Sequence, residues 1–580
     1  MDMKFLSLDN YYLSNLYERG LDEEKKKRFG IFYTPKYVID YMVRSILKNH
    51  DFKNKPYLKI LDLSCGCGNF LLEVYDILYE KFYFLKDELK IEDIHKHIVK
   101  NCLYGVDIDK NAINILKSSL KNKSIDSDFD EFNIYCFDSL NLNGLDENLK
   151  QTFFYGEFDY IIGNPPYIGH KNLESDYKKF LLNNYSEVYK DKSDIYFCFY
   201  KRIIDLLKKG GVASIITPRY FLESQSGSFI RDYIIKNIKI KEVIDFNGFN
   251  VFKNASIASC IFTMEKNSDY SSFNFFRFNN IDCSAASIKN IELFKNDEKF
   301  FTKININQCD LNENWIIDKK ENIELFNIIE KNCKFKLKDI CVSFQGVITG
   351  CDKAFVLNKD DSKKENIEMD ILRNWVKNKN INKYFIGDTN LKLIYSNDIV
   401  SEDDYLNSIN HIKKYKNKLE NRRECKKNIR KWYELQWGRD KSMFERKKIM
   451  YPYKSNENKF AIDENNSFCS ADVYSFYIKK EYEKDFSYEY LVGILNSSVY
   501  DKYFKVFAKK MGKNLYDYYP NKVMDISIFK DENYLNIENL SRLIIKLSKF
   551  DDKFLKEINY LQSKIDVLIK NSLNINSLNH

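Results

Sequence analysis

The sequence predicts an α/β protein, with a mostly parallel sheet in its first half and an α+β domain in its second half. From about residue 30 to 265, short apolar runs alternate with helix-length segments, which is the pattern of repeated β-α units. From about 335 to 525, shorter aromatic segments are broken by Asn, Gly and Ser. These patterns divide the chain into a helical, charged lead-in at residues 1–29, a first domain at 30–330 and a second domain with C-terminal helices at 331–580.

Seven apolar runs are the candidate strands of the first domain. Most of them are followed by a segment of helical length, such as residues 69–82 after the first run. The predicted strands are Leu58–Leu63, Leu103–Asp107, Asn133–Phe137, Tyr160–Gly163, Gly211–Thr217, Ile240–Phe246 and Ser259–Met264.

Two further segments have a distinct character. Residues 265–330 are polar and irregular, and we expect them to carry the domain junction. The tail from Ile537 to Leu573 is predicted to be helical, with one apolar stripe at 4-3-4-3 spacing. Barely two heptads are present, so this stripe should pack against its own protein rather than form a dimer zipper. The stripe consists of Phe554, Ile558, Leu561, Ile565 and Leu568.

The composition excludes several classes of protein. Hydrophobic residues make up 44% of the chain and aromatic residues 16%, enough for large cores, so disorder is excluded as the bulk state. No uncharged apolar stretch approaches the roughly 18 residues of a membrane helix. The 13 cysteines are irregularly spaced, which favours reduced thiols and no metal site. We expect a soluble intracellular protein that does not associate with a membrane.

The positive charge of the chain is concentrated in one segment. Residues 411–459 hold 17 Lys or Arg and 6 Asp or Glu, a net charge of +11, against +8 for the whole chain. Interleaved aromatic residues would add base stacking to phosphate contacts. The alternative is a solvated Lys-rich helix face. The aromatic residues are Trp432, Tyr433, Trp437, Tyr451 and Tyr453. The expected nucleic-acid contacts are Arg422, Arg423, Lys426, Lys427, Arg430, Lys447, Lys448 and Lys454, with Gln345 and Arg439 as candidate base readers.

The first predicted strand runs into a glycine-bearing turn and then a helix, over Leu58–Phe70. Gly66 and Gly68 permit positive φ and a close approach of a ligand to the backbone. Asp62, at the end of the strand, can accept hydrogen bonds from a cationic or amino-bearing ligand. The turn could also hold a dinucleotide phosphate, but it lacks the third glycine of that fingerprint.

Two more carboxylates follow the next two strands. Asp107 ends the second strand and is placed to bind two vicinal ribose hydroxyls. Asp138, followed by Ser139, ends the third and can accept from an exocyclic amine such as adenine N6. Open α/β sheets bind ligands at the carboxyl ends of their strands. Since no basic residues accompany the glycines, the three carboxylates favour a nucleoside without phosphates.

The fourth strand stops in Asn164-Pro165-Pro166-Tyr167. Two consecutive prolines stiffen this turn and remove two backbone donors. The side-chain oxygen of Asn164 and the carbonyl of Pro165 can therefore converge on one planar NH₂ group and accept both its hydrogens. This makes the nitrogen a nucleophile, and Tyr167 supplies an aromatic face for the ring that bears it.

Together these motifs resemble the AdoMet-dependent amino-methyltransferases, specifically the gamma class of DNA N6-adenine methyltransferases. In this class a Tyr-Thr-Pro motif precedes the glycine loop, and here it lies within Gly30–Pro35. The glycine loop, the two aspartates and Asn-Pro-Pro-Tyr then follow in the same order as in the family. In the glycine loop Leu63 and Cys67 depart from the family's proline and hydroxyl residue. The resemblance implies a Rossmann-like AdoMet-dependent methyltransferase domain with no metal.

The resemblance also assigns site residues. Catalysis falls to Asn164, Pro165, Pro166 and Tyr167, with Phe252 as a second aromatic that sandwiches the flipped adenine against Tyr167. The residues expected to bind AdoMet are Tyr33, Thr34, Pro35, Asp62, Ser64, Gly66, Asn69, Phe70, Asp107, Ile108, Asp138, Ser139 and Asn164.

The second domain resembles the target-recognition domain of single-chain Type IIG restriction–modification proteins. Those proteins begin with a nuclease, for which the motif at Tyr33 leaves no room, so the resemblance implies a solitary methylase. It implies double-stranded DNA as partner, no obligatory protein subunit, a monomer, and a site that need not be palindromic. The matching stretches are Phe344–Gly350, Arg430–Trp437, Lys447–Tyr453, Ser470–Tyr474 and Tyr519–Lys522.

Two alternatives stay open from the sequence. An RNA adenine N6-methyltransferase would use the same chemistry. A non-catalytic nucleic-acid-binding specificity subunit would need no catalytic residues, and the intact Asp62, Asp107, Asn164 and Tyr167 count against it.

Overall fold

In the computed structural model the chain forms two compact units, Met1–Ile317 and Asp318–His580. The structure describes residues 14, 17, 20, 30, 32–123, 129, 131–154, 156–190, 192–252, 257–267, 269, 271–279, 290–312, 314–512 and 514–575.

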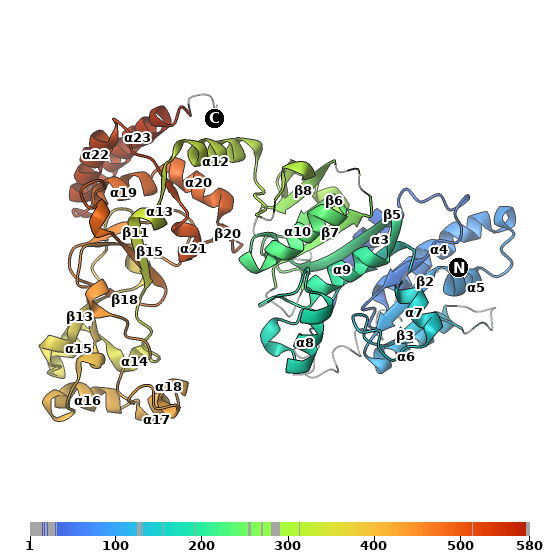
Figure 1. The fold of residues 1–580 in the computed structure, drawn as a ribbon, viewed down its shortest axis with the longest axis horizontal. Helices are drawn as coiled ribbons and strands as arrows, with labels where there is room; N and C mark the ends of the chain where they lie inside the picture. The colour runs from blue at the N-terminus through green and yellow to red at the C-terminus, as the bar shows by residue number, and fades with distance from the viewer. Residues whose placement is uncertain are drawn as a thin grey trace. The chain divides into compact units, whose positions relative to one another are not determined.

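The first unit is built on one nine-stranded sheet of order β3-β2-β1-β4-β5-β7-β6-β8-β9. Figure 1 labels several of its strands, among them β2, β3 and β5. The strands from β3 to β5 are all parallel, whereas β7 runs antiparallel to both β5 and β6. The mostly parallel sheet predicted from the sequence is therefore confirmed. The strands are β1 Ile60–Asp62, β2 Leu103–Asp107, β3 Asn133–Cys136, β4 Phe158–Gly163, β5 Leu207–Pro218, β6 Lys239–Asp245, β7 Ser259–Glu265, β8 Ser272–Phe278 and β9 Phe301–Asn307.

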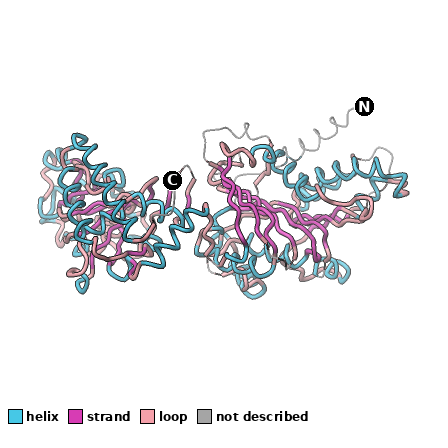
Figure 2. The backbone as a smooth tube through the Cα atoms, turned by 90° about the horizontal axis from the view of Figure 1, so that it is seen from above, coloured by secondary structure: helices cyan, strands magenta, loops and turns pink. Residues whose placement is uncertain are grey.

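Helices cover both faces of this sheet (Figure 2). Side chains alternate between the faces of a strand, so Leu61 and Ile161 belong to one core while Ile60 and Ile162 belong to the other. Burial on both sides explains why these strands read as continuous apolar runs. The helices are α3 Lys36–Leu47, α4 Asn69–Leu89, α5 Ile94–Asn101, α6 Lys110–Asn122, α7 Glu147–Phe154, α8 Ser175–Asn184, α9 Tyr196–Leu206, α10 Ser228–Asn237 and α11 Ile291–Phe294.

All seven predicted strands are present, but the sequence missed β8 and β9. They lie in the segment that we expected to be irregular. In β9 the buried Ile304 and Ile306 alternate with the exposed Lys303, Asn305 and Asn307. The many polar residues on the solvent side of this edge strand hid its period of two.

The second unit begins before the predicted boundary at 330/331, which falls inside α12, Lys320–Asn332. Leu325 and Ile329 of this helix pack in the core of the second unit. The other helices are α13 Leu337–Ile340, α14 Asp352–Phe355, α15 Lys359–Lys364, α16 Leu406–Lys413, α17 Lys416–Glu420, α18 Arg423–Lys426, α19 Tyr488–Leu495, α20 Ser498–Phe507, α21 Pro520–Val523, α22 Tyr534–Leu547 and α23 Leu555–Ser572.

Four small sheets complete the second unit, in the orders β10-β22, β11-β19-β15-β17, β12-β14-β13-β18 and β16-β21-β20. Nearly all their pairings are antiparallel, as an α+β domain requires. The strands are β10 Phe335–Lys336, β11 Cys341–Gln345, β12 Val356–Asn358, β13 Leu372–Val376, β14 Leu391–Ile394, β15 Lys448–Pro452, β16 Lys454–Ser455, β17 Ala461–Asp463, β18 Phe468–Cys469, β19 Val473–Ile478, β20 Lys509–Lys510, β21 Tyr516–Asp517 and β22 Ser527–Ile528.

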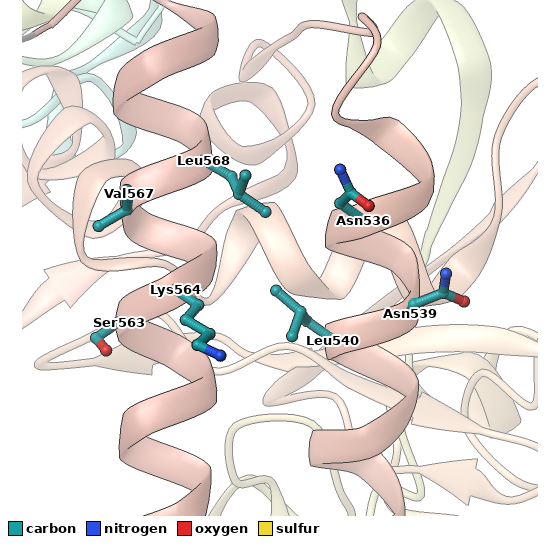
Figure 3. Close-up of a pocket in the computed structure, with 7 residues that line it drawn as sticks. All are labelled: Asn536, Asn539, Leu540, Ser563, Lys564, Val567 and Leu568. Atoms are coloured by element: carbon teal, nitrogen blue, oxygen red, sulfur yellow. The ribbon is translucent and has the colours of Figure 1, made fainter.

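The C-terminal helices α22 and α23 pack side by side. Ile558, Leu561, Ile565 and Leu568 of the predicted stripe contact the core of the second unit, so the stripe packs within its own chain as expected. A groove of about 450 Å³ lies between the two helices, and Figure 3 shows Leu540 pointing into it. The groove is lined by Asn536, Asn539, Leu540, Ser563, Lys564, Val567 and Leu568. Among the described residues, no helix combines the length and the apolar character needed to cross a bilayer.

Candidate active site

A cavity of about 540 Å³ lies at the carboxyl ends of β1 to β4. The strand order reverses at β1, which has β2 on one side and β4 on the other, and such switch points are where open α/β sheets bind ligands. Most of the residues that the sequence assigned to the cofactor line this one cavity. They are Thr34, Asp62, Ser64, Gly66, Asn69, Phe70, Asp107, Ile108, Asp138, Ser139 and Asn164, together with Pro166 of the catalytic motif.

The glycine loop has the geometry that its sequence requires. Gly66 and Gly68 have φ of 51° and 88°, and a Cβ on Gly68 would meet Leu116 at 2.1 Å. The Gly66 N–H donates to Asp107 Oδ2 at 2.8 Å, and Asp109 N–H donates to Asp107 Oδ1 at 2.8 Å. Asp107 therefore holds the loop in place besides facing the cavity, and its burial raises its pKa.

Asp62 is a buried carboxyl with no cationic partner among the described residues. It is 1% exposed and accepts from the Ser64 N–H at 3.0 Å. Burial, followed by the nearby charge of Asp107, raises the pKa of Asp62 to about 8. Gly163 has no room for a side chain, because a Cβ would lie 2.5 Å from Asp62 Oδ1. Thus the residue before Asn164 must be small for Asp62 to lie beside the motif.

The third carboxylate has a partner that the sequence did not reveal. Asp138 accepts from the Leu140 N–H at 2.9 Å and from the Tyr177 hydroxyl at 2.7 Å. Tyr177 belongs to α8 and lines the cavity. Tyr17 also lines it and donates to Asp109 Oδ2 at 2.7 Å. Neither tyrosine lies in a recognisable motif, so only the fold brings them to the site.

The side-chain amide of Asn164 has a defined orientation. Its Nδ2 donates to the Phe32 carbonyl at 2.9 Å and to Thr34 Oγ1 at 3.1 Å, while its Oδ1 accepts from the Tyr167 hydroxyl at 2.5 Å. A backbone carbonyl can only accept, so this network assigns the nitrogen and the oxygen without ambiguity. The Ser64 hydroxyl also donates to the Asn164 carbonyl at 3.1 Å. The Asn164 side-chain oxygen keeps one lone pair for a further donor.

The aromatic residues around Asn164 differ from the predicted sandwich. The rings of Tyr167 and Phe252 lie 6.1 Å apart and are inclined at 71°, whereas a planar base between two parallel rings needs about 7 Å. Phe32 stacks on Tyr167 instead, at 5.0 Å and 23°. Phe32 lies in the Gly30–Pro35 motif, and sequence reasoning overlooked it because only Tyr33, Thr34 and Pro35 carried the resemblance.

Five of the predicted site residues lie outside the lining of the cavity. Tyr33, Pro35, Pro165, Tyr167 and Phe252 do not line the cavity. The Pro35 carbonyl accepts from the first turn of α3, and Tyr167 is 9% exposed.

Asp194, buried, anchors the segment after Tyr167. Its Oδ1 accepts from the Ile168 N–H at 3.1 Å and from the Tyr196 N–H at 3.4 Å. Burial raises the pKa of Asp194 to about 6. This carboxyl ties the segment after the Asn-Pro-Pro-Tyr turn to the start of α9.

The basic segment of the second unit is only partly a surface. Arg423, Lys426, Lys427, Arg439 and Lys454 are exposed, so phosphate or base contacts by them stay predictions. The segment therefore has an exposed cationic surface. Other cations of the segment bind within the protein, as the contacts of Lys448 and Arg422 show.

Two residues that were predicted to contact nucleic acid, Lys448 and Arg422, are bound within the protein instead. Lys448 is fully buried and paired with Asp463 at 2.5 Å, since it starts the central strand β15. Arg422 donates to the carbonyls of four residues and so organises its own loop; they are Leu419, Thr349, Trp432 and Glu434.

Other members of the segment are also engaged within the protein. Lys447 pairs with Glu464 at 2.8 Å and Glu489 at 2.9 Å. Arg430 lies 4.0 Å from Glu434. Tyr433 and Tyr451 are buried in the core, so the stacking predicted for these two is wrong, whereas Trp437 is 39% exposed. The linear pattern could not reveal which face of the segment meets solvent.

Both units are similar to known families. Residues 101–252 match the family of the Eco57I restriction-modification methylase. Residues 365–528 match the TaqI-like C-terminal specificity domain. The first match contains Asp107, Asp138 and the Asn164 motif, and the second contains the whole basic segment.

Named relatives align over most of the chain. The Type II methyltransferase M.HindII of Haemophilus influenzae is 25% identical, over 95% of this chain and all of that protein. The Type II methyltransferase M.BanIII of Aneurinibacillus aneurinilyticus is 24% identical, over 83% of this chain and 86% of that protein.

Solved structures share the fold at low identity. The Type IIL restriction-modification enzyme MmeI, solved in complex with DNA, superposes with a TM-score of 0.67 at 16% identity, over 97% of this chain and 78% of that chain. The DrdV–DNA complex superposes with a TM-score of 0.57 at 14% identity, over 93% of this chain and 59% of that chain.

Proposed function

We propose that this chain, a DNA methyltransferase of the restriction–modification type with a TaqI-like specificity domain, transfers a methyl group from AdoMet to N6 of an adenine in double-stranded DNA. The observation that carries the proposal is the oriented amide of Asn164, whose side-chain oxygen lies beside the ring of Tyr167 at a cavity lined by carboxylates.

The residues that line the cavity provide hydrogen-bond acceptors for the donor groups of AdoMet. Asp62 is a buried carboxyl without a cationic partner in the described part of the chain, which suits the α-amino group. The buried Asn69 Oδ1 likewise has no hydrogen-bond partner among the described residues. Asp107 would accept from the ribose hydroxyls, and Asp138 with Ser139 would hold the adenine end. AdoMet supplies the electrophilic methyl group.

Asn164 and Pro165 would make the amine reactive. The Asn164 side-chain oxygen and the Pro165 carbonyl would accept both hydrogens of N6, so that its lone pair leaves conjugation with the ring and can attack the methyl group. The bond from that methyl group to the sulfonium sulfur would break, and the sulfur would leave as a neutral thioether. Positive charge develops on N6 in the transition state, and two oriented acceptors stabilise it without reorganising. The methylated nitrogen then releases one proton to solvent.

The adenine must leave the helical stack to reach Asn164. Tyr167 is the ring on which it would stack. Since Phe32 now covers that ring at 5.0 Å, we expect Phe32 to move or to be displaced when the base enters. Phe252, which lies 5.9 Å from Phe32, would then contact the edge of the base.

We further propose that the chain acts as a monomer on one strand of an asymmetric site and needs no nuclease, in the bacterial cytoplasm where the chromosome lies. One catalytic unit with one specificity domain has no two-fold axis, so its site need not be palindromic. The relatives M.HindII and M.BanIII are themselves named as methyltransferases.

Modification-sensitive sequencing of DNA and RNA from a host that expresses the chain tests the proposal. We expect N6-methyladenine on one strand of a defined DNA sequence, and its loss with the Asn164→Ala variant. Modification confined to RNA, modification of both strands of a palindrome, or a need for a separate specificity subunit would contradict the respective part of the proposal.

A further inference from the structure

Arg439 in the second unit has a strained and well-anchored backbone. Its φ is +65°, a region that residues other than glycine rarely occupy. The neighbouring Trp437 exchanges two backbone hydrogen bonds with Ile348, at 2.9 and 3.1 Å. The Tyr395 hydroxyl donates to the Arg439 carbonyl at 2.9 Å. Such strain persists where the surroundings determine the conformation, and it is common at functional sites.

The turn before Arg439 is also rigid. A Cβ on Gly438 would meet the Asn397 side chain at 2.7 Å. That side chain is itself held, because its Oδ1 accepts from the Leu435 N–H at 3.0 Å. The direction in which Arg439 leaves the backbone is therefore set by three neighbouring segments.

The guanidinium of Arg439 is held by a hydrogen bond to the side chain of Gln345. Arg439 Nη2 donates to Gln345 Oε1 at 2.7 Å, and Gln345 Nε2 donates to the Ala471 carbonyl at 3.1 Å. Gln345 ends β11 and pairs with Tyr474 of β19, so it is fixed to the four-stranded sheet β11-β19-β15-β17. One polar end of Gln345 thus holds Arg439, and the other end is itself held by the Ala471 carbonyl.

Arg439 shares two properties with Arg423 and Arg446 of the basic segment: it is exposed, and no carboxylate of the described residues lies within 4.0 Å of it. It differs from both because its guanidinium donates to the side chain of Gln345. Arg422 is bound to backbone carbonyls, Arg430 lies near Glu434, and Arg446 lies over the ring of Tyr477 at 4.1 Å. Arg439 thus combines a fixed orientation with an uncompensated charge, which a structural arginine would not need.

We propose that Gln345 and Arg439 form one reading unit that recognises a guanine in the DNA site, an inference that rests on the proposed function. The outer edge of a guanidinium carries two parallel donors, which match the O6 and N7 acceptors of guanine in the major groove. A phosphate contact needs the charge but not the orientation. Gln345 contributes by holding the inner edge, so losing either residue should affect the same base pair.

A library of DNA sites randomised one position at a time tests this, with methylation scored by sequencing. We expect Arg439→Lys and Gln345→Ala each to relax the choice of the same G·C pair by about tenfold to a hundredfold. The double variant should relax it no further than the stronger single one. Arg423→Ala is the matched control; it should lower methylation of all sequences alike and reduce the salt dependence of binding.

Three results would overturn the inference: relaxation at two different positions, relaxation at an A·T pair, or a uniform loss that follows the Arg423 control. An Arg439→Lys protein that is inactive on all sequences, with wild-type melting temperature and AdoMet affinity, would also overturn it. If the wild-type chain methylates no adenine in DNA, the proposed function itself fails. If it does, and both variants keep the wild-type site, only the reading unit fails.

Discussion

The Tyr167 hydroxyl donates a 2.5 Å hydrogen bond to the side-chain oxygen of Asn164, three residues earlier in the same turn. The hydroxyl also lies 3.1 Å from the Ile216 carbonyl at the end of β5. The hydroxyl of Tyr167 therefore orients the amide, whereas the proposed function assigns the ring of Tyr167 to stacking on the base. The hydroxyl and the ring of Tyr167 should therefore contribute separately, and substitutions can distinguish the two contributions.

Tyr167→Phe keeps the ring and removes the hydroxyl. We expect it to slow methyl transfer by about tenfold, the effect of one lost hydrogen bond, and to leave AdoMet affinity unchanged. Tyr167→Ala also removes the ring and should slow transfer much further. Single-turnover assays with saturating DNA measure both. A Tyr167→Phe enzyme as slow as Tyr167→Ala would mean that the ring contributes nothing.

Substitutions of Asn164 and of Asp107 should affect different steps, methyl transfer in the first case and AdoMet binding in the second. Asn164→Ala should abolish transfer while AdoMet affinity stays within a few-fold. Asp107→Ala should weaken AdoMet binding by about 2 kcal/mol or more, because Asp107 also holds the Gly66 N–H at 2.8 Å. Calorimetric titration with AdoMet and a methylation assay check the pair. Near-normal turnover by Asn164→Ala would exclude this motif from catalysis.

The raised pKa of Asp62 predicts a proton linkage. Since its pKa is about 8 in the free protein, most of this carboxyl is protonated at pH 7. A cationic α-amino group favours the charged form and lowers that pKa, so binding at pH 7 should release up to about one proton. Affinity should accordingly rise as the pH increases toward about 8, where the α-amino group begins to lose its own proton.

Titration of AdoMet at pH 7 in phosphate and in Tris measures this release, because the two buffers differ in ionisation enthalpy. The apparent binding enthalpy should differ between the buffers for the wild type. It should be the same in both for Asp62→Asn, which cannot ionise. Equal enthalpies for the wild type would show that Asp62 does not change protonation.

Phe32 should control entry of the base. It stacks on Tyr167 at 5.0 Å, where the adenine would lie. Duplexes with 2-aminopurine at the target should fluoresce more strongly on binding, as base flipping requires. With Phe32→Ala the rise should be faster, since no side chain has to be displaced. An unchanged rate, with catalytically competent DNA, would place Phe32 outside the path of the base.

Lys426 and Lys448 are a matched pair of cations with opposite surroundings. Lys426 is exposed on α18, so Lys426→Ala should weaken binding to all sequences and lower the log–log salt slope by about 1. Lys448 is fully buried against Asp463, and its loss should destabilise the domain by roughly 3–5 kcal/mol.

Salt-dependent binding and chemical denaturation distinguish the two lysines. Lys448→Met should cost less stability than Lys448→Asn if apolar contacts around the aliphatic stem matter. A reduced salt slope for the folded Lys448 variant would mean that this lysine reaches DNA after all.

Most strands of the first unit could be predicted from the sequence. Its strands are buried on both faces, so Leu58–Leu63 and Tyr160–Gly163 stand out as continuous apolar runs. Strands such as β9 do not, because half of their residues face solvent. In the second unit the short strands leave too few residues for any period to be read.

By itself the sequence determined the order of the motifs and the types of their donors and acceptors. Asp62, Asp107, Asp138 and Asn164 follow successive parallel strands, and the carboxyl ends of such strands meet at one edge whatever the loops do. This property depends only on topology, so local patterns were enough to predict it.

Only the tertiary structure decided which side chains share a contact across distant segments. Phe32 stacks on Tyr167, Tyr177 binds Asp138, and the Arg439 guanidinium rests on Gln345, over separations of 135, 39 and 94 residues. It also decided that Lys448 is buried, whereas Arg446 is exposed and Lys447 pairs with Glu464. These outcomes depend on packing and on the direction of each side chain, and a linear pattern of residue types contains neither.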